Sequence, residues 1–251
     1  MTLYDNKYYI IRIGDFATNG NKKIIYSLFS IFLCLEEYIN NNSYDCFVIM
    51  MGSTFVWTII EIYLNVTKTR VIKPMYITLF NKNKYKLHKY VGIFLQGFQE
   101  GGVVTTFGLY FGDRLFDIKY LLFFHIFIFY IIINMTIKKS NEKIVSKRQI
   151  NTPVSMGTMG YITLYNLKTL YQNPLHFYRQ ATMFLSMIYV CSIWTIIAYV
   201  KNFRKVEIHI KNNNHYIVKN DTYMDAFLIL GYDVIFEIGF AYLTFYNWFI
   251  L

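Results

Sequence analysis

Charged residues are scarce in this chain of 251 residues, where Asp, Glu, Lys and Arg together make up only 16%. Soluble domains usually carry about 25%. Proline occurs three times and hydrophobic residues make up 55%, which excludes intrinsic disorder and a collagen-like structure. The three cysteines are odd in number and lack metal-ligand spacing, so a disulfide framework is excluded. The composition therefore does not fit an ordinary water-soluble domain.

Long apolar runs account for this composition. A membrane-spanning helix needs about 20 mostly apolar residues, and several stretches reach that length. They cover residues 46–65, 90–111, 118–137, 181–200 and 223–251. A shorter run covers residues 24–39, and the segment 154–171 is apolar but interrupted by glycine and polar residues. These are the candidate membrane spans.

The distribution of Lys and Arg indicates whether 154–171 crosses the membrane. Short cytoplasmic loops retain basic residues, whereas translocated loops are depleted of them. If 154–171 crosses, most of the 25 Lys and Arg residues fall on one side. We therefore predict an all-α, multi-pass integral membrane bundle of seven transmembrane helices, formed by residues 1–251 as one domain, with a cytoplasmic amino terminus. Six spans with a surface helix at 154–171 is the alternative.

The loop around residues 205–219 has its own pattern. Val206, Ile208 and Ile210 alternate with polar residues, and Tyr216 and Val218 resume the alternation, which predicts a small cytoplasmic β-hairpin. An irregular solvated loop is the alternative. The basic loops are expected to contact anionic lipids. They lack the interleaved aromatic platforms of nucleic-acid sites, so no nucleic-acid partner is expected.

Acidic residues inside the predicted spans are the main functional signal. Each costs about 2.5–3.5 kcal/mol on insertion scales, so such residues usually face the bundle interior and mark a site. Glu100 lies near the middle of its span, one turn after Gln96. Glu61 lies in the second span, and Asp233 and Glu237 share a face of the last one. No Lys or Arg lies at comparable depth, so we expect these acids to lack a basic partner and to bind protons or a cation.

Two further features of the spans are notable. His125 is an imidazole in the middle of the fourth span, where it could relay protons, although a lone His is more often an ordinary interior residue. A stripe of glycines that lets a neighbouring helix approach closely runs beside the acid of the third span. Its members are Gly97, Gly101, Gly108 and Gly112. No motif of a metal, nucleotide or dinucleotide site is present, so no metal or cofactor is predicted.

Three functions remain open on the sequence alone. The favoured one is a proton or cation translocator or channel, because the acids are spread along the depth of the bundle. Its expected site residues are Glu61, Gln96, Glu100, His125, Asp233 and Glu237. The second is a membrane-embedded enzyme that modifies a lipid or isoprenoid by acid–base chemistry, with an apolar cavity beside the acids. The third is a non-catalytic structural or assembly protein.

Overall fold

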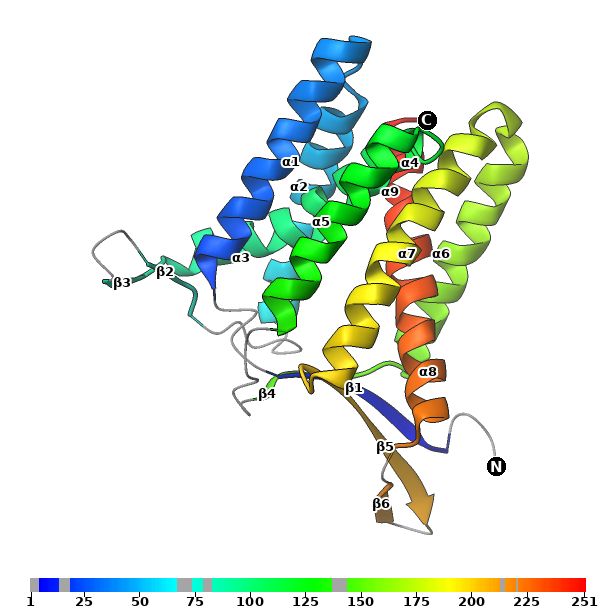
Figure 1. Cartoon of the computed structure of the whole chain (residues 1–251). Helices are drawn as coiled ribbons and strands as arrows, with labels where there is room; N and C mark the ends of the chain where they lie inside the picture. The colour runs from blue at the N-terminus through cyan, green and yellow to red at the C-terminus, as the bar shows by residue number, and fades with distance from the viewer. Residues whose placement is uncertain are drawn as a thin grey trace.

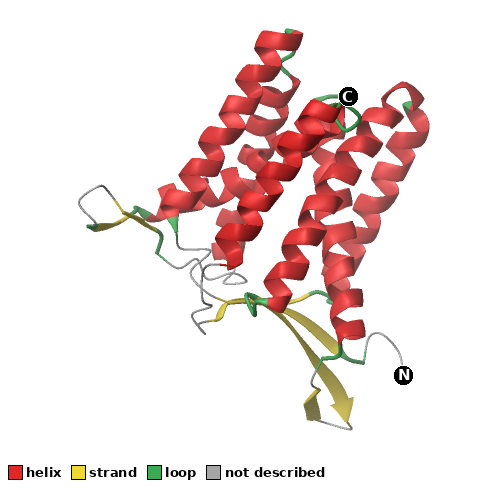
Figure 2. Ribbon diagram, in the orientation of Figure 1, coloured by secondary structure: helices red, strands yellow, loops and turns green. Residues whose placement is uncertain are grey.

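The structure is a computed structural model of the chain, and its described residues are mostly helical (Figure 2). It describes residues 5–13, 19–66, 74–78, 83–136, 144–212, 215–219 and 221–251, with only the backbone described for 131–136 and 144–146.

The described residues form seven helical rods (Figure 1). Five are the helices α1 (Gly20–Asn41), α2 (Asp45–Val66), α5 (Ile118–Thr136), α6 (Pro153–Gln172) and α7 (Phe177–Val200), the last preceded by the short 3-10 helix η3 (Pro174–His176). The third rod joins α3 (Lys89–Gly97), the π-helix η2 (Phe98–Val103) and α4 (Val104–Asp113). The last rod joins α8 (Tyr223–Tyr232), the π-helix η4 (Asp233–Phe240) and α9 (Ala241–Phe249). Each predicted span thus lies on a helix, apart from residues 250–251, which follow the end of α9, and residue 137, which lies outside the described residues.

Local signals explain where two of these helices begin. Thr152 precedes α6 and accepts a hydrogen bond from the backbone N–H of Ser155, with Pro153 at the first helical position. Thr222 precedes α8 and exchanges hydrogen bonds with Asp225 in a capping box. Both arrangements satisfy N–H groups that a helix start leaves without an intrahelical partner.

A four-stranded antiparallel sheet covers one end of the helices (Figure 1). Its strand order is β4 (Ile144–Gln149), β1 (Lys7–Ile13), β5 (Arg204–Asn212) and β6 (His215–Lys219). The β5–β6 pair confirms strands at the predicted hairpin, although residues 213–214 lie outside the described residues. The prediction of an all-α fold is wrong, because β1 finds its partners more than a hundred residues later in the chain, where no local pattern reveals them.

The described part of the basic loop between α2 and α3 also lies at the sheet end (Figure 1). Its strands β2 (Tyr76–Thr78) and β3 (Lys84–Lys86) pair with each other, and Asn21 at the start of α1 hydrogen-bonds the backbone of Thr78. The amino-terminal strand and the described parts of the three basic loops, which contain β2–β3, β4 and β5–β6, therefore gather at the same end of the helices. This placement requires α6 to run from the sheet end to the far end, and Figure 1 shows α6 beside the last rod.

The register of the sheet puts three arginines on its helix-facing side. Arg204 lies opposite Arg12, and Arg148 lies opposite Ile10. Residues directly opposite each other share a face, as do residues two apart on one strand. Ile10 is buried in a cluster that includes Ile229 of α8, so this shared face points toward the helices.

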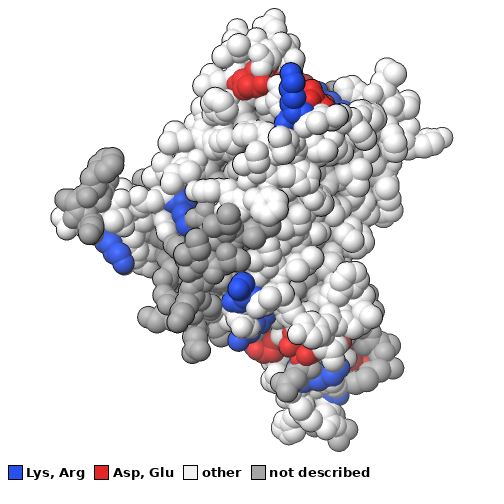
Figure 3. Space-filling view, viewed as in Figure 1, with Lys and Arg blue, Asp and Glu red and all other residues white. Residues whose placement is uncertain are grey.

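The outer surface of the rods is strongly apolar. Three helical segments are long and apolar enough to cross a membrane: Asp45–Val66, Pro174–Val200 and Tyr223–Phe249. Large apolar residues that are more than half exposed include Leu28, Phe55, Leu122, Leu164, Ile196 and Phe227. Figure 3 shows that most charged side chains on one face gather toward two ends, with a broad and largely uncharged band between them. Soluble monomers rarely expose so much contiguous apolar surface, so these features indicate association with a membrane.

Candidate functional site

The π-helices carry three of the predicted site acids. Glu100 lies on η2, and Asp233 and Glu237 lie on η4. A π-helix hydrogen-bonds each residue to one five positions away, is rare, and frequently occurs at functional sites. Both π-helices interrupt otherwise α-helical rods at the point where these rods border one cavity.

Asp233 is the most deeply buried of these acids, with a side chain that is 3% exposed. Arg148 lies 2.8 Å from Asp233, between its Nη2 and Oδ1 atoms, and also pairs with Glu237. Arg204, whose side chain is 1% exposed, pairs with the other carboxylate oxygen of Asp233 and donates a hydrogen bond of 2.9 Å to Thr195. Two sheet arginines thus neutralise the carboxylates on η4.

Glu100 has a different set of partners. Arg12 Nη1 lies 3.4 Å from Glu100 Oε1, and the Trp57 indole N–H donates to Oε2 at 3.0 Å. Gln96 also donates to this carboxylate from one turn earlier. The buried ammonium of Lys23 donates to Gln96 at 2.5 Å, which extends the network from η2 to α1.

We call these three acids and three arginines the sheet-side cluster; its members are Arg12, Glu100, Arg148, Arg204, Asp233 and Glu237. The prediction that the acids lack a basic partner is wrong for all three of them. That prediction considered only Lys and Arg within the spans, whereas the arginines reach the acids from strands. Paired carboxylates do not require a bound cation for neutralisation.

A cavity of about 260 Å³ lies inside the bundle beside the sheet-side cluster. This volume is just below the range for small-molecule sites, roughly 300–1,000 Å³. Its polar end is lined by Lys22 and by every member of the cluster except Arg204. Its remaining wall is mostly apolar and includes Val104, Phe107, Phe124, Phe127, Val190 and Ile238. The cavity is therefore amphipathic.

The glycine stripe sets how closely the third rod approaches its neighbours. A Cβ on Gly101 would come within 2.8 Å of main-chain atoms of α2, and one on Gly112 within 2.7 Å of those of α7. Gly97 also lies against α2, and Gly108 against α7. The stripe contacts two helices rather than the one neighbour expected for an ideal α-helix, because the wider turn of η2 shifts the helical phase.

Two of the predicted site residues lie elsewhere. Glu61 is completely buried on α2 but does not line the cavity. His125 does not line it either; its ring nitrogens lie 2.7 Å from the carbonyl oxygen of Leu121 and 3.1 Å from the Tyr189 hydroxyl. The cavity therefore gathers Glu100, Asp233 and Glu237, with Gln96 bonded to the first of them.

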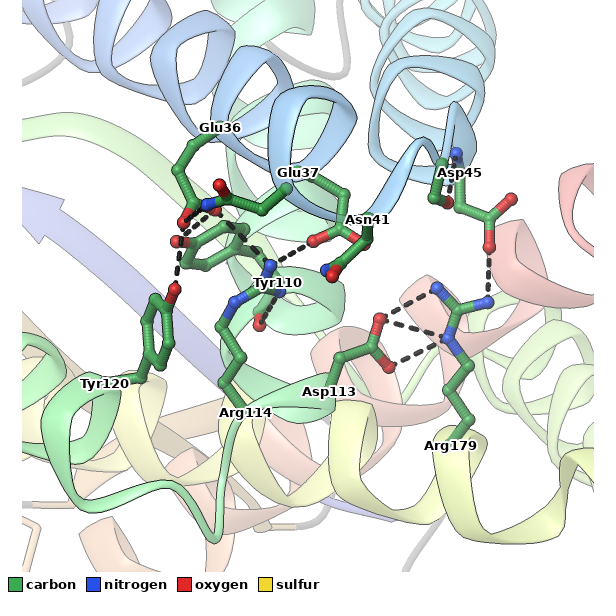
Figure 4. Close-up of polar contacts among 11 residues, drawn as sticks. Glu36, Glu37, Asn41, Asp45, Tyr110, Asp113, Arg114, Tyr120 and Arg179 are labelled. Carbon is green, nitrogen blue, oxygen red and sulfur yellow. Dashed lines mark hydrogen bonds and ion pairs between the residues drawn. The ribbon is translucent and has the colours of Figure 1, made fainter.

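A second set of ion pairs lies at the opposite end of the rods (Figure 4). We call it the far-end cluster; its members are Glu36, Glu37, Asp45, Asp113, Arg114 and Arg179. Arg114 pairs with both acids of α1, at 3.3 Å to Glu36. The Glu36 carboxylate also accepts hydrogen bonds from the Tyr110 and Tyr120 hydroxyls, at 2.7 and 2.9 Å.

The other half of the far-end cluster centres on Arg179 of α7. Its guanidinium lies 2.8 Å from Asp113 at the end of α4 and pairs with Asp45 at the start of α2. Figure 4 shows this guanidinium reaching between the two carboxylates. No member of the far-end cluster lines the cavity. These pairs tie α1, α2, α4 and α7 together at their ends.

Comparison of the chain with protein-family models, curated proteins and solved structures found no match.

Proposed function

We propose that this chain is a seven-span membrane protein that binds an anionic single-chain lipid in the cavity beside the sheet-side cluster. The observation that carries the proposal is the amphipathic cavity itself, with a mostly apolar wall that ends at charged groups. An apolar ligand tail gains free energy by leaving water, and a charged head needs a polar partner at one end. Ion flow has no comparable need for an aromatic wall.

The charges at the polar end favour an anionic head group. Three basic side chains line this end, those of Arg12, Lys22 and Arg148. Two more lie behind it, Lys23, which bonds Gln96 and Gln99, and Arg204, which pairs with Asp233. Three carboxylates oppose them, those of Glu100, Asp233 and Glu237. The excess of positive charge attracts a carboxylate or phosphate, and Arg presents a planar donor pair that matches either group.

The arrangement of the basic segments supports a cytoplasmic location for the sheet end. The amino-terminal strand and the described parts of the basic loops gather there. Because Lys and Arg are enriched in cytoplasmic loops, this end is expected to face the cytoplasm. The cavity mouth then lies near the inner interface, where anionic lipid head groups are concentrated. Lys84 and Lys86 on β3 would contact the same lipid surface.

Tryptophan fluorescence offers a direct test. Trp57 and Trp194 line the cavity, whereas Trp248 lies near the far end of the last rod and is exposed. In a Trp248→Phe background in detergent micelles, a fatty acid brominated along its chain should quench the two remaining tryptophans. Dodecanoic acid should reverse the quenching by competition. Quenching that a large excess of dodecanoic acid leaves unchanged would refute cavity binding.

A matched pair of variants on α7 controls for contact with surrounding detergent. Val190→Phe fills the cavity and should abolish the quenching that dodecanoic acid reverses. Ile196→Phe adds a similar side chain on the exposed face of the same helix and should leave it unchanged.

Translocation of a proton or cation is the second candidate. The observation in its favour is that Glu100, Asp233 and Glu237 border one internal cavity. Its test is ion flux in proteoliposomes, which Glu100→Gln and Glu237→Gln should abolish.

Chemistry on a bound lipid would use the same carboxyls as acid and base, and it would appear as an altered lipid product after incubation with the purified protein.

A further inference from the structure

Ser186 breaks a pattern that other hydroxyl residues in these helices follow. Ser27, Ser30, Thr54 and Thr163 each donate a hydrogen bond to the carbonyl oxygen four residues earlier, at 2.6–3.0 Å. This bond satisfies a buried hydroxyl within its own helix. The Ser186 hydroxyl is buried, with the residue 2% exposed, yet it has no hydrogen-bond partner among the described residues.

Ser186 also lines the cavity. A buried polar atom without a partner in the protein is uncommon and calls for an explanation. The buried Thr106 hydroxyl also has no hydrogen-bond partner in the described part of the chain, but Thr106 does not line the cavity. Ser186 is therefore placed to bond something that enters the cavity.

The position of Ser186 along α7 defines where that bond would form. Met183 packs against Gly112 and Met187 against Gly108, and of the α7 residues that line the cavity Ser186 lies farthest from the sheet. Trp194 lies at the other end, where the Arg204 guanidinium stacks over its ring at 5.4 Å. Eight residues of α-helix separate Ser186 from Trp194, a rise of about 12 Å.

We infer that the cavity selects a bipolar lipid, with an anionic group at the Trp194 end of the cavity, where Arg204 of the sheet-side cluster lies, and a hydroxyl or carbonyl up to about 12 Å away that bonds Ser186. The ligand class is thus an ω-oxygenated medium-chain fatty acid or an amphiphile of the same pattern. This inference rests on the proposed function, because it specifies the ligand of the same cavity. The apolar wall between the two polar ends, which includes Val104 and Val190, suits the methylene chain.

The test compares two ligands that differ in one atom. Dodecanoic acid and ω-hydroxydodecanoic acid compete against the brominated fatty acid in the Trp248→Phe background, which gives a dissociation constant for each. The intact cavity should bind the hydroxylated ligand more tightly. Ser186→Ala should shift the ratio of the two constants by about tenfold or more toward dodecanoic acid, because the ligand hydroxyl then enters an apolar pocket without a partner.

Ser30→Ala is the matched control, because Ser30 is equally buried in α1 but donates to the carbonyl oxygen of Tyr26 and does not line the cavity. It should leave the ratio unchanged. Both ligands partition into the same micelles in every variant, so the ratio isolates the cavity. If both ligands compete but Ser186→Ala leaves their ratio unchanged, the inference is wrong and lipid binding stands. If neither ligand competes in the intact protein, the proposed function itself is wrong.

Discussion

The sheet-side and far-end clusters both pair arginines with carboxylates, but they are built from different parts of the chain. In the far-end cluster, acids and arginines lie at or near helix ends, and each ion pair joins two different helices. In the sheet-side cluster, acids on π-helices are met by arginines from strands of the sheet. Only the second cluster borders the cavity. Ion pairing alone therefore does not mark a binding site, whereas pairing beside an open amphipathic space does.

The largest expected effect is on stability and concerns the most buried pair. Arg204→Ala leaves the Asp233 carboxylate without one of its two arginines in a site where both partners are almost fully enclosed. Loss of one partner from a buried pair costs about 3–5 kcal/mol. Thermal unfolding in detergent should show this loss for Arg204→Ala.

Arg114→Ala should destabilise the protein by a similar amount, because Arg114 and Glu37 are comparably buried in the far-end cluster. Lys219→Ala provides the control, since its exposed pair with Asp225 should contribute only about 0–1 kcal/mol. Equal melting temperatures for Arg204→Ala and Lys219→Ala would contradict the burial argument.

The next effect separates the two clusters by function. Arg148 and Arg179 each bridge two carboxylates, and their side chains are 42% and 27% exposed. Arg148→Ala should weaken binding of dodecanoic acid by about 10- to 100-fold, since a charged hydrogen bond contributes about 1.5–3 kcal/mol. Arg179→Ala should leave the affinity unchanged while lowering stability.

The competition assay with the brominated fatty acid measures both affinities. Equal losses of affinity in Arg148→Ala and Arg179→Ala would mean that the clusters do not differ in function.

A smaller effect concerns the glycines that set the helix spacing near each cluster. Gly101→Ala pushes η2 away from α2 and Gly112→Ala pushes α4 away from α7, each at a cost of roughly 1–3 kcal/mol. Only Gly101→Ala should also change the emission of Trp57, which bonds the neighbouring Glu100. Gly157→Ala is the control, because a Cβ there meets nothing within 4 Å. A Gly112→Ala variant that alters Trp57 emission as strongly would contradict this separation.

The smallest effect is on how the stability of the protein depends on pH. It concerns Glu207 in the sheet that supplies the arginines. Burial opposes ionisation of Glu207, but Lys147 and His209 outweigh it and hold the pKa of this carboxyl below its ordinary value of 4.5. A lowered folded-state pKa stabilises the protein above the unfolded pKa, and the contribution is lost as the pH falls through the folded pKa. The melting temperature of the native protein should therefore exceed that of Glu207→Gln at neutral pH. The difference should shrink below about pH 4; a difference that is constant with pH would count against the pairing.

The helices were predictable because apolar run length is a local property. The segment 154–171 was the hardest case, and α6 shows a continuous helix there, which the seven-span prediction and its six-span alternative both include. The β5–β6 pair was predictable from alternation alone. β1 was not predictable from the sequence. Its three isoleucines, which the structure buries, fit a basic amino-terminal tail as well as a strand until the partner strands are known.

The site was only partly predictable. The sequence identifies Glu100, Asp233 and Glu237 as interior acids, because charge is costly inside a span. It cannot reveal that both acid-bearing rods widen into π-helices, since no residue pattern specifies that hydrogen bonding. The arginines were missed for a geometric reason. Arg12 and Arg148 lie outside the spans in sequence but reach the acids through the sheet.

Photo-crosslinking tests the central claim of a lipid inside the cavity most directly. A fatty acid that carries a diazirine along its chain is activated in the purified protein, and the labelled residues are identified by mass spectrometry. Labels should fall on cavity residues such as Val104, Phe107 and Val190, and excess dodecanoic acid should remove them. Labels confined to the outward-facing Phe55, Phe129 and Ile196 would contradict the claim, because they would mark lipid around the bundle and none within it.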